Sequence, residues 1–421
     1  MITVKSADEL EREKQEEIKR RAEANQAQAP IIDNLAAHVH KKWQIAKSHK
    51  LTITDRLTDC LRRRRGQYSP DKLDKIRTTG GSEIYMNITA SKCIGAKAWL
   101  SDLFSSDRPF TVEPTPISEL QPEIHEELVT KTLSVIMQTG MPEEQAMQVM
   151  KKHEDRLKNE MKEVAESRME KMADHIDDVM IEGNWRRVFD EFLDDLVTYP
   201  TAIISGINFK ARKKVKWVEL NGQHVPKKEI SLSREFERVS PFDAYPSPTT
   251  DSTHQTWFIQ HVRYTPEDLA NMRKAKGYNA DAIFRVLSDY RNNGRREWLF
   301  NSGERDRLEG RQGMMSTDYD LIDGVKYSGT VQGQQLIEWG MNPQSVPDPM
   351  DEYCVSVVVI GPYTIRALVN PDPAGKINYY WTSFRSVPGS FWGEALPESI
   401  ADTQDTCNAT ARALINNMAR S

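Results

Sequence analysis

The sequence predicts an α+β fold, in which a mainly helical first half is followed by a β-rich second half. Up to residue 200 the apolar residues recur at helical spacing, as at Leu35, Val39 and Trp43. Beyond residue 200, short apolar runs bounded by turn residues predict strands, for example at 201–207 and 354–360. Of the 421 residues, 38% are hydrophobic and 28% are charged, which is enough apolar material for a packed core. We therefore expect a mixed body of long helices and antiparallel strands.

The N-terminal fifty residues predict a helical arm in two parts. Residues 6–29 are rich in Glu, Lys, Arg, Gln and Ala, which is typical of a solvated helix with charge pairs along its surface. Pro30 is expected to end this helix, because proline lacks an N–H and clashes with the preceding turn. A second helix over 31–50 should bury one apolar face and leave Ile45 outside that face.

Two more helices are expected before residue 105. The first, over 52–68, carries four consecutive arginines at 62–65 and then Gly66. Such a run is more often a solvated helix end than a phosphate contact, and both interpretations stay open. The second helix covers 87–104. Ile88, Trp99 and Leu103 fall on one face of this helix, and we expect that face to be buried.

Residues 119–196 predict helical segments that are divided at 140–142 and that kink or end near 183–185. Within this block, Asp174, His175 and Asp178 would lie roughly on one helical face. They are the residues in the sequence that most resemble a set of metal ligands. A metal site would need further ligands from elsewhere, so exposed helix charge is the favoured interpretation. The acidic pair at 194–195 has no partner that the sequence suggests.

The second half predicts strands joined by turns. The expected strands are 201–207, 214–220, 236–239, 257–262, 335–339 and 354–360. Asn221-Gly222 should form a hairpin turn. Thr265, Pro266 and Asp268 have the spacing of a capping box, so a helix should begin there. Residues 291–327 are polar and Gly-rich, which favours a loop or inserted segment.

Composition and motifs argue against several classes of protein. The formal net charge of −5 disfavours binding of DNA over the whole surface. The four cysteines are far apart in the sequence, so they do not have the spacing of a zinc or redox site: Cys60, Cys93, Cys354 and Cys407. No signal peptide, apolar run of membrane-spanning length, phosphate-binding loop or hydrolase motif is evident. We expect no enzyme activity, no cofactor and no metal.

Four stretches, in this order, carry a family resemblance. The first is Ile84-Tyr85-Met86-Asn87-Ile88, followed by a helix and Asp107-Arg108-Pro109; the second is Phe192–Gly206. The third is Val239–Pro248, a turn before the helix that Thr265 caps. The fourth begins with the aromatic and polar run Tyr380–Val387 and continues to Met418; it contains Pro388-Gly389-Ser390-Phe391-Trp392-Gly393, then Gln404, Asn408 and Ile415-Asn416-Asn417-Met418. Together they resemble the portal proteins of tailed bacteriophages, of the podovirus kind.

The resemblance implies a wing-type body that leads into a stem helix and a closed head-to-tail connector ring of twelve subunits. It implies a channel through which double-stranded DNA is packaged and ejected, at a vertex of the virion, after assembly in the host cytoplasm. The implied partners are the major capsid protein, terminase, and tail adaptor or tail proteins. The implied divisions are an N-terminal arm at 1–50, a helical wing part at 51–200, a β-rich wing part at 201–395 and the start of the stem at 396–421. Portal chains usually continue past this helix into a clip, a second stem helix, a tunnel loop and a crown. The resemblance therefore implies that the given sequence is a fragment of such a chain or a portal whose remainder is missing.

The last helix has two faces with different expected roles. The face expected to pack on a neighbouring subunit carries Ile400, Cys407, Leu414, Ile415 and Met418. The face expected to look into the channel carries Asp402, Asp405, Arg412 and Asn416, where acidic groups would let DNA slide past. The turn from wing to stem consists of Pro388, Gly389, Phe391, Trp392 and Gly393. An ordinary amphipathic helix with one wet face is the alternative.

Two other functions remain open from the sequence. A metal-dependent nuclease of DNA packaging would need a cluster of carboxylates that binds Mg²⁺. A sequence-neutral nucleic-acid-binding protein would show steeply salt-dependent affinity for duplex DNA. Phe391 and Trp392 are candidates for a contact between ring subunits, although packing in the core is an equal alternative.

Overall fold

The computed structural model describes residues 7–104, 112–113, 130, 134, 143–220, 223–249, 256–274, 277–293, 303–309, 321–370 and 375–419. Helices and antiparallel sheets are both present, so the predicted α+β class is confirmed. The chain divides into two compact units: Met1–Ser101 with Val188–Asn208 and Phe236–Ser421, and Asp102–Arg187 with Phe209–Glu235. The first unit takes segments from all four divisions that the resemblance implies, so the compact units do not follow those boundaries.

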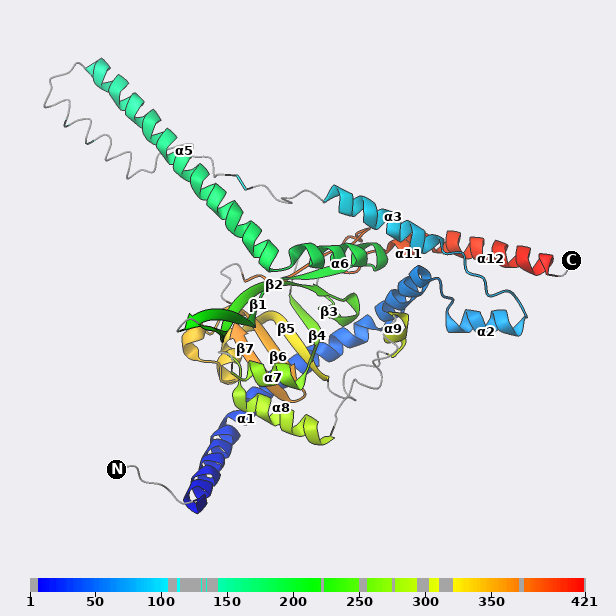
Figure 1. The fold of residues 1–421 in the computed structure, drawn as a ribbon, viewed down its shortest axis with the longest axis horizontal. Helices are drawn as coiled ribbons and strands as arrows, with labels where there is room; N and C mark the ends of the chain where they lie inside the picture. The colour runs from blue at the N-terminus through cyan, green and yellow to red at the C-terminus, as the bar shows by residue number, and fades with distance from the viewer. Residues whose placement is uncertain are drawn as a thin grey trace. The chain divides into compact units, whose positions relative to one another are not determined.

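A five-stranded antiparallel sheet forms the centre of the first unit (Figure 1). Its order is β3 (Ala244–Pro246), β4 (Trp257–Tyr264), β5 (Ile322–Gln332), β6 (Glu352–Ile360) and β7 (Tyr363–Val369). Phe258 stands opposite Ser328, which in turn stands opposite Ser356. The strands expected at 257–262 and 354–360 are confirmed, because runs of β-branched and aromatic residues pack well on a pleated, buried surface.

The second sheet has the order β2 (Gln223–Val239), β1 (Ala202–Leu220) and β8 (Tyr379–Thr382). Ile203 pairs with Trp381, so the fourth stretch of the family resemblance adds a strand to the second. The strand character expected at 201–207, 214–220 and 236–239 is confirmed, but the first two ranges belong to one continuous strand, β1, and the third is the end of β2. The turn expected at Asn221-Gly222 lies outside the described residues.

One helix, α1 (Ala7–Arg65), runs for 59 residues, so the predicted breaks at Pro30 and between residues 50 and 52 are wrong. A proline removes one hydrogen bond and bends a helix, but it does not end the helix where the flanking turns are otherwise favourable. The apolar stripe of α1 is confirmed: Leu35, Val39, Trp43 and Ala46 are buried, and Ile45 lies outside it, 39% exposed.

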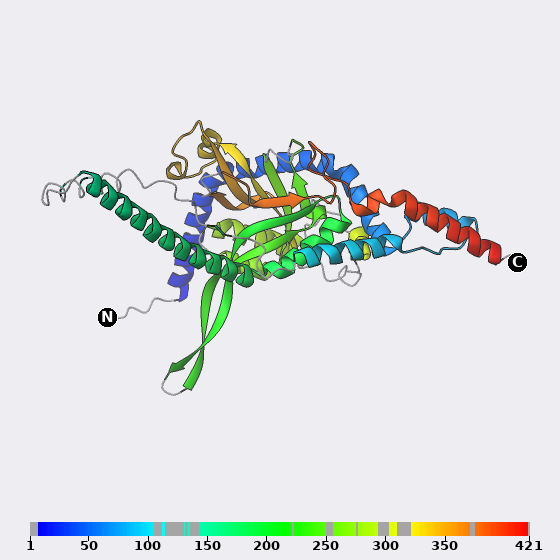
Figure 2. The same cartoon turned by 90° about the horizontal axis from the view of Figure 1, so that it is seen from above.

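The stripe of α1 covers one face of the five-stranded sheet. It packs on side chains of β4, β5 and β6, among them Ile259, Val325 and Val357. Because α1 contacts both edge strands, β3 and β7, it crosses the full width of the sheet (Figures 1 and 2). The other face is covered by α7 (Pro266–Met272), α8 (Ala280–Asn293), β1 and β8.

The expected capping box is confirmed at the start of α7. The Thr265 hydroxyl accepts a hydrogen bond from the N–H of Asp268 at 3.1 Å, and the Asp268 carboxylate accepts one from the N–H of Thr265 at 3.1 Å. This reciprocal pair satisfies two backbone donors that the helix itself cannot use. Leu269 of the same helix is fully buried on the sheet.

Two predictions for the second half are wrong. Residues 335–339 are not a strand, because α10 (Gly333–Glu338) occupies most of that range and is followed by the 3₁₀ turn η4 (Pro343–Ser345). Nor are the described parts of 291–327 a loop. The helix α8 continues to Asn293, α9 covers Gly303–Leu308, and β5 begins at Ile322.

The remaining helices of the first half only partly match the expectations. These are α2 (Pro70–Thr78), α3 (Ile88–Leu103), α5 (Glu143–Glu182) and α6 (Trp185–Thr198). The expected break near 183–185 is confirmed, with Asn184 at a φ of +56°. The predicted buried face of α3 is wrong: Trp99 is 82% and Leu103 73% exposed, whereas Thr89 and Cys93 are buried. None of the described helices is both long and apolar enough to cross a membrane. The division expected at 140–142 and the segment 107–109 lie outside the described residues.

Candidate interface around the C-terminal helix

The turn before the last helices is anchored in the core by an aromatic side chain. Phe391 is buried, and its ring lies 4.9 Å from the Trp381 ring and 6.2 Å from the Phe258 ring. Trp392 is half-buried against Phe391 at 4.9 Å. Of the two roles expected for these aromatics, core packing is therefore the one that Phe391 fills. Gly389 turns the chain at a φ of +75°, a conformation that favours glycine.

Gly393 is the close-packed end of this turn. A Cβ on Gly393 would meet the side chain of Ser383 and would come within 2.5 Å of the Arg385 carbonyl oxygen. Its N–H donates to the Thr201 hydroxyl at 3.3 Å, and that hydroxyl donates to the carbonyl oxygen of Phe391 at 3.0 Å. The second and fourth stretches of the resemblance are thus joined by hydrogen bonds as well as by strand pairing.

A short helix, α11 (Leu396–Ser399), follows and is tied to α1. Glu398 accepts from the backbone N–H of Ala395 at 2.8 Å, which suits a carboxylate in the first turn of a helix. Arg56 of α1 donates to both carboxylate oxygens of Glu398, at 2.7 and 3.0 Å, and to the carbonyl oxygen of Gly393 at 2.9 Å. One arginine therefore fixes both the turn and the start of the last helices.

The last helix, α12 (Ala401–Met418), buries two amide side chains, Gln404 and Asn408. Gln404 accepts from the Thr89 N–H at 3.0 Å and from the Thr89 hydroxyl at 2.9 Å, and its amide N–H donates to the Met86 carbonyl oxygen. Asn408 accepts from the Met86 N–H at 2.8 Å. Asn416, two turns further on, accepts from the N–H of Ser82 at 3.0 Å. This amide row holds the segment 82–89 against the helix mainly through its backbone.

Three of the four side chains expected to face a channel are engaged within the chain. Asp405 pairs with Lys72 at 3.0 Å and with Arg63 at 3.4 Å. Burial alone would raise the pKa of Asp405, but these two cations hold it below its ordinary value. Arg412 lies 5.3 Å above the Tyr68 ring. Asn416 belongs to the amide row, and Asp402 is the exposed member of the set.

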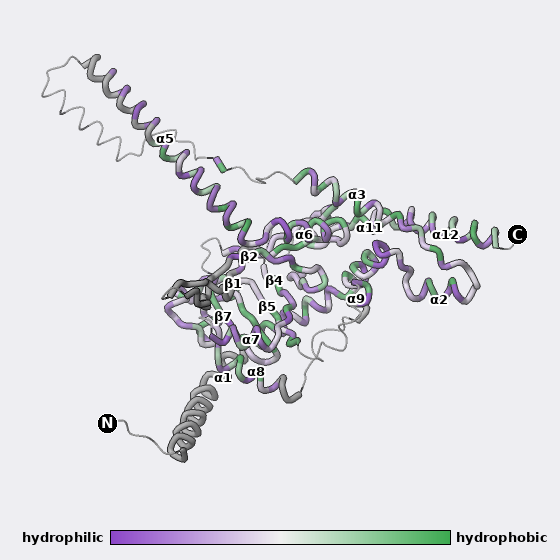
Figure 3. The backbone as a smooth tube through the Cα atoms, viewed as in Figure 1, coloured by the Kyte–Doolittle hydropathy of each residue, from purple (hydrophilic) through white to green (hydrophobic). Residues whose placement is uncertain are grey.

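The apolar face of α12 is only partly buried among the residues that the structure describes. Leu414 is 61% and Met418 70% exposed, while Ile400, Cys407 and Ile415 are intermediate. Within the described residues, the fully buried positions of this helix are the amides Gln404 and Asn408. Figure 3 shows hydrophilic and hydrophobic residues interspersed along α12, so hydropathy does not mark the buried side. The role of the apolar face in packing between subunits stays a prediction.

The arginine run at the end of α1 makes ion pairs within the chain. Arg62 pairs with Asp59, and Arg63 with Asp405. Arg64 pairs with Asp194 at 2.6 Å and also donates to the Thr198 hydroxyl. Gly66 ends the helix at a φ of +67°, as expected of a helix-terminating glycine. These contacts favour a structural role for the run over a phosphate contact.

Asp194 and Asp195, near the end of α6, both form ion pairs, although the sequence suggested no partner for them. Asp194 binds Arg64, and Asp195 accepts two hydrogen bonds from Arg238, at 2.6 Å each. Asp195 is buried, so removing Arg238 would leave an uncompensated charge. Asp174, His175 and Asp178 do not form a metal-binding group: among the described residues, no three His, Cys, Asp or Glu side chains are placed to hold an ion.

The four stretches of the resemblance meet around the C-terminal half of α1. A single apolar cluster joins the second, third and fourth stretches to that helix: Leu57, Cys60, Leu61, Tyr199, Phe242, Leu308 and Ala395. Lys50, buried on α1, donates to the carbonyl oxygen of Phe242 at 2.5 Å, and burial holds its pKa well below the ordinary value. The first stretch joins through the amide row of α12.

Comparison of the sequence with models of known protein families and with curated proteins finds no match. The resemblance to portal proteins thus rests on the residues of the four stretches.

Proposed function

We propose that the chain is a structural subunit of a portal ring, which forms the channel for DNA packaging and ejection at a vertex of a phage virion. The observation that carries this proposal is the meeting of the four portal-like stretches. They are separated by up to about three hundred residues in sequence, yet three of them share one apolar cluster with α1, and Met86 of the first is held by Asn408 of the fourth. Residues that serve one architecture should pack together in this way, whereas four chance similarities have no reason to do so.

Exposed apolar side chains supply surfaces for assembly into a ring. On α12 these are Leu414 and Met418, and on α3 they are Ile94 and Trp99. Fully burying one such side chain is worth about 1.5–3 kcal/mol, so a neighbouring subunit that covers several would gain a stable contact. A closed ring uses head-to-tail interfaces, in which two different patches of the chain meet. We propose that the apolar face of α12 is one of the two.

The channel lining follows from the same helix. Asp402 is exposed on α12, on a chain whose net charge is −5. Acidic groups along a channel repel phosphate, so DNA passes without the counterion release that holds it to basic proteins. Asp405, Arg412 and Asn416 would instead keep the helix attached to its own subunit. The coat protein, terminase and tail proteins are the partners that such a ring would dock.

Electron microscopy and mass photometry of the purified chain test the proposal. We expect rings with an axial hole. The double variant Leu414→Glu with Met418→Glu should dissociate them, because it places charge in the apolar contact. Thr410→Glu adds a charge at another exposed position of α12 and should leave the rings intact.

Three results would contradict the proposal. The first is a monomer at every protein concentration. The second is cleavage of plasmid DNA that requires Mg²⁺, which would favour the nuclease. The third is tight, steeply salt-dependent binding of duplex DNA by a monomer, which would favour a sequence-neutral DNA-binding protein.

A further inference from the structure

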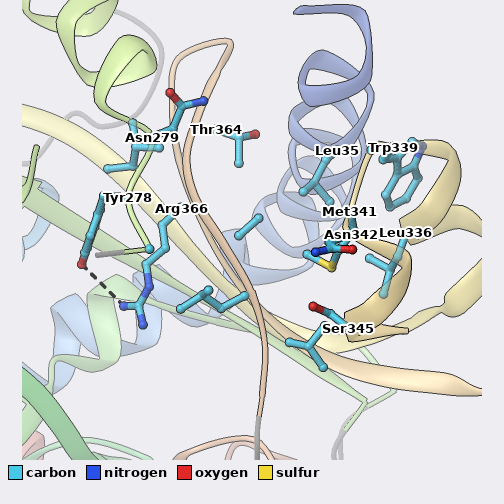
Figure 4. Close-up of a pocket in the computed structure, with 16 residues that line it drawn as sticks. Leu35, Tyr278, Asn279, Leu336, Trp339, Met341, Asn342, Ser345, Thr364 and Arg366 are labelled. Carbon is cyan, nitrogen blue, oxygen red and sulfur yellow. Dashed lines mark hydrogen bonds between the residues drawn. The ribbon is translucent and has the colours of Figure 1, made fainter. Parts of the chain in front are cut away.

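A pocket of about 400 Å³ lies at the edge strand β7, remote in sequence from α12. Its lining comes from β7, the middle of α1, the segment before α8, and the segment that includes α10 and η4. Figure 4 shows Arg366 and Tyr278 on one side of the strand, with Leu35, Leu336 and Trp339 on the other. The pocket therefore has a polar end and an apolar end, and its volume is in the range of small-molecule sites.

Arg366 at the polar end has a partly unused guanidinium. Its Nη1 lies 3.5 Å from the Tyr278 hydroxyl, and the group stands 5.3 Å from the Tyr278 ring centroid. Its Nε is buried and donates to none of the described residues. No carboxylate of a described residue forms an ion pair with it. A buried donor without an acceptor destabilises the folded chain, so an acceptor that reaches it is favoured.

Elsewhere in this protein, arginines bind carboxylates through Nε and Nη2, which form one edge of the guanidinium. Arg238 holds Asp195 through Nε and Nη2, at 2.6 Å each. Arg56 holds Glu398 through the same two nitrogens, at 2.7 and 3.0 Å. This fork matches the two oxygens of a carboxylate and adds geometric specificity to the charge attraction. In Arg366 the Nη1 lies near the Tyr278 hydroxyl, and the buried Nε on the other edge has no acceptor among the described residues.

The rest of the pocket sets the size and charge of that anion. Arg366 is the single cationic residue among the described residues that line it, which suits a group with one negative charge better than a phosphate. Two lining amides are already occupied: Asn279 caps α8 at 3.1 Å, and Asn342 accepts from the Gln344 N–H at 3.0 Å. The apolar end is formed by Leu35, Leu336, Trp339 and Met341.

We propose that this pocket binds a carboxylate that carries an apolar body, with the carboxylate on Arg366 and the body beside Trp339. The carboxylate can belong to a free organic acid or to the C-terminus of a peptide, since both present the same group. The proposal goes beyond the ring function and does not depend on it, because no residue of α12 or α3 lines the pocket.

Calorimetric titration of the full chain tests the proposal with matched acid and amide probes. The free-acid probe is 4-phenylbutyrate with its amide, and the peptide probe is N-acetyl-leucyl-leucine as acid and as C-terminal amide. We expect at least one acid to bind at least about tenfold more tightly than its amide, since charge-assisted bidentate hydrogen bonds are lost in the amide. Whichever acid binds identifies the source of the carboxylate.

Variants separate this site from the rest of the surface. Arg366→Met should abolish the difference between acid and amide, and Arg366→Lys should restore only part of it, because lysine lacks the fork. Arg273→Met, at an exposed position of the same unit outside the pocket, should bind as the unchanged chain does. Trp339→Ala should weaken acid and amide alike.

Several outcomes would overturn the proposal. It fails if neither acid binds, if acid and amide bind equally, or if Arg366→Met leaves the preference for the acid intact while the protein still unfolds cooperatively. The proposal would also be overturned if inorganic phosphate competed for the site as effectively as the acid, because binding would then depend on negative charge and not on a carboxylate with an apolar body.

Discussion

Replacement of Gln404 by leucine should detach segment 82–89 from the last helix. Leucine has a similar size and suits a helix, but it cannot donate or accept. The side chain of Gln404 makes hydrogen bonds with Thr89, with the Met86 carbonyl oxygen and, at 3.1 Å, with Asn408. All of these would be lost at a position that is fully buried.

The size of the effect follows from the number of bonds. A net hydrogen bond is worth about 1 kcal/mol, and buried partners left without water cost more. The loss of three bonds to the segment therefore corresponds to about 3 kcal/mol of local stability. If opening is in rapid equilibrium, that is about a hundredfold loss of amide protection at residues that the helix holds, since 1.4 kcal/mol is tenfold.

Hydrogen–deuterium exchange measured by mass spectrometry is the assay. Peptides that contain Met86 and Thr89 should lose protection in Gln404→Leu. Thr403→Leu makes the same apolar addition at the neighbouring exposed position and should leave protection unchanged. Unchanged protection at Met86 and Thr89 in Gln404→Leu, with a change in denaturant stability below about 1 kcal/mol, would refute the view that this amide holds the segment.

Three further predictions concern ion pairs and glycines. The pKa of Asp405 in the folded chain lies below the ordinary 3.8, so the stability that its ionised carboxylate adds is present above pH 3.8 and is lost as the pH falls through the folded pKa. Asp405→Asn should therefore flatten this part of an acid-unfolding curve. An unchanged curve would contradict the prediction. Arg238→Met should cost about 3–5 kcal/mol in urea unfolding, and a second change, Asp195→Leu, should recover much of it; no recovery would show that the lost charge balance is not the cause. Gly393→Ala should lower the unfolding free energy by about 1–3 kcal/mol through steric overlap, whereas Gly95→Ala, in an open helical position, should raise it by up to about 1 kcal/mol; equal effects of the two would contradict the packing assigned to Gly393.

The parts of the fold that could be predicted are those with a local cause. The capping box of Thr265 and Asp268 is a matter of three neighbouring residues, and both predicted and observed helices start there. The stripe of α1 that contains Val39 and Trp43 follows from the period of an α-helix. Burial of this kind is decided within one element, so a single sequence is enough to show it.

The errors arise where a local signal is outweighed, either by the rest of the same helix or by a distant part of the chain. Pro30 is a strong local signal for the end of a helix, yet α1 continues through it. Residues 335–339 have an apolar pattern that suits a short strand, but they form a helix whose Leu336 packs into the cluster beneath α1. Trp99 has the size and hydrophobicity of a core residue, and its exposure reflects the absence of any described segment over that part of α3.

The sequence indicates where the candidate interface lies, but not which side of the last helix its own chain buries. It places Gln404 and Asn408 on this helix, and the apolar pattern predicts that Leu414 and Met418 pack on a neighbouring subunit, which stays a prediction. The structure buries the amides and exposes the two apolar residues. The signal that could have identified the inner side is the spacing of Gln404, Asn408 and Arg412 at every fourth residue, which places them in one row along the helix.

The amide row has a consequence for how the chain can change over generations. Asn408 and Asn416 bind N–H groups of the main chain, at Met86 and Ser82, rather than the side chains there. Nearly any amino acid presents the same N–H, so side chains along 82–88 can drift without loss of these bonds. Proline is the exception, because it removes the donor. The constraint thus falls on the amides of α12, while the segment they hold is left open to variation.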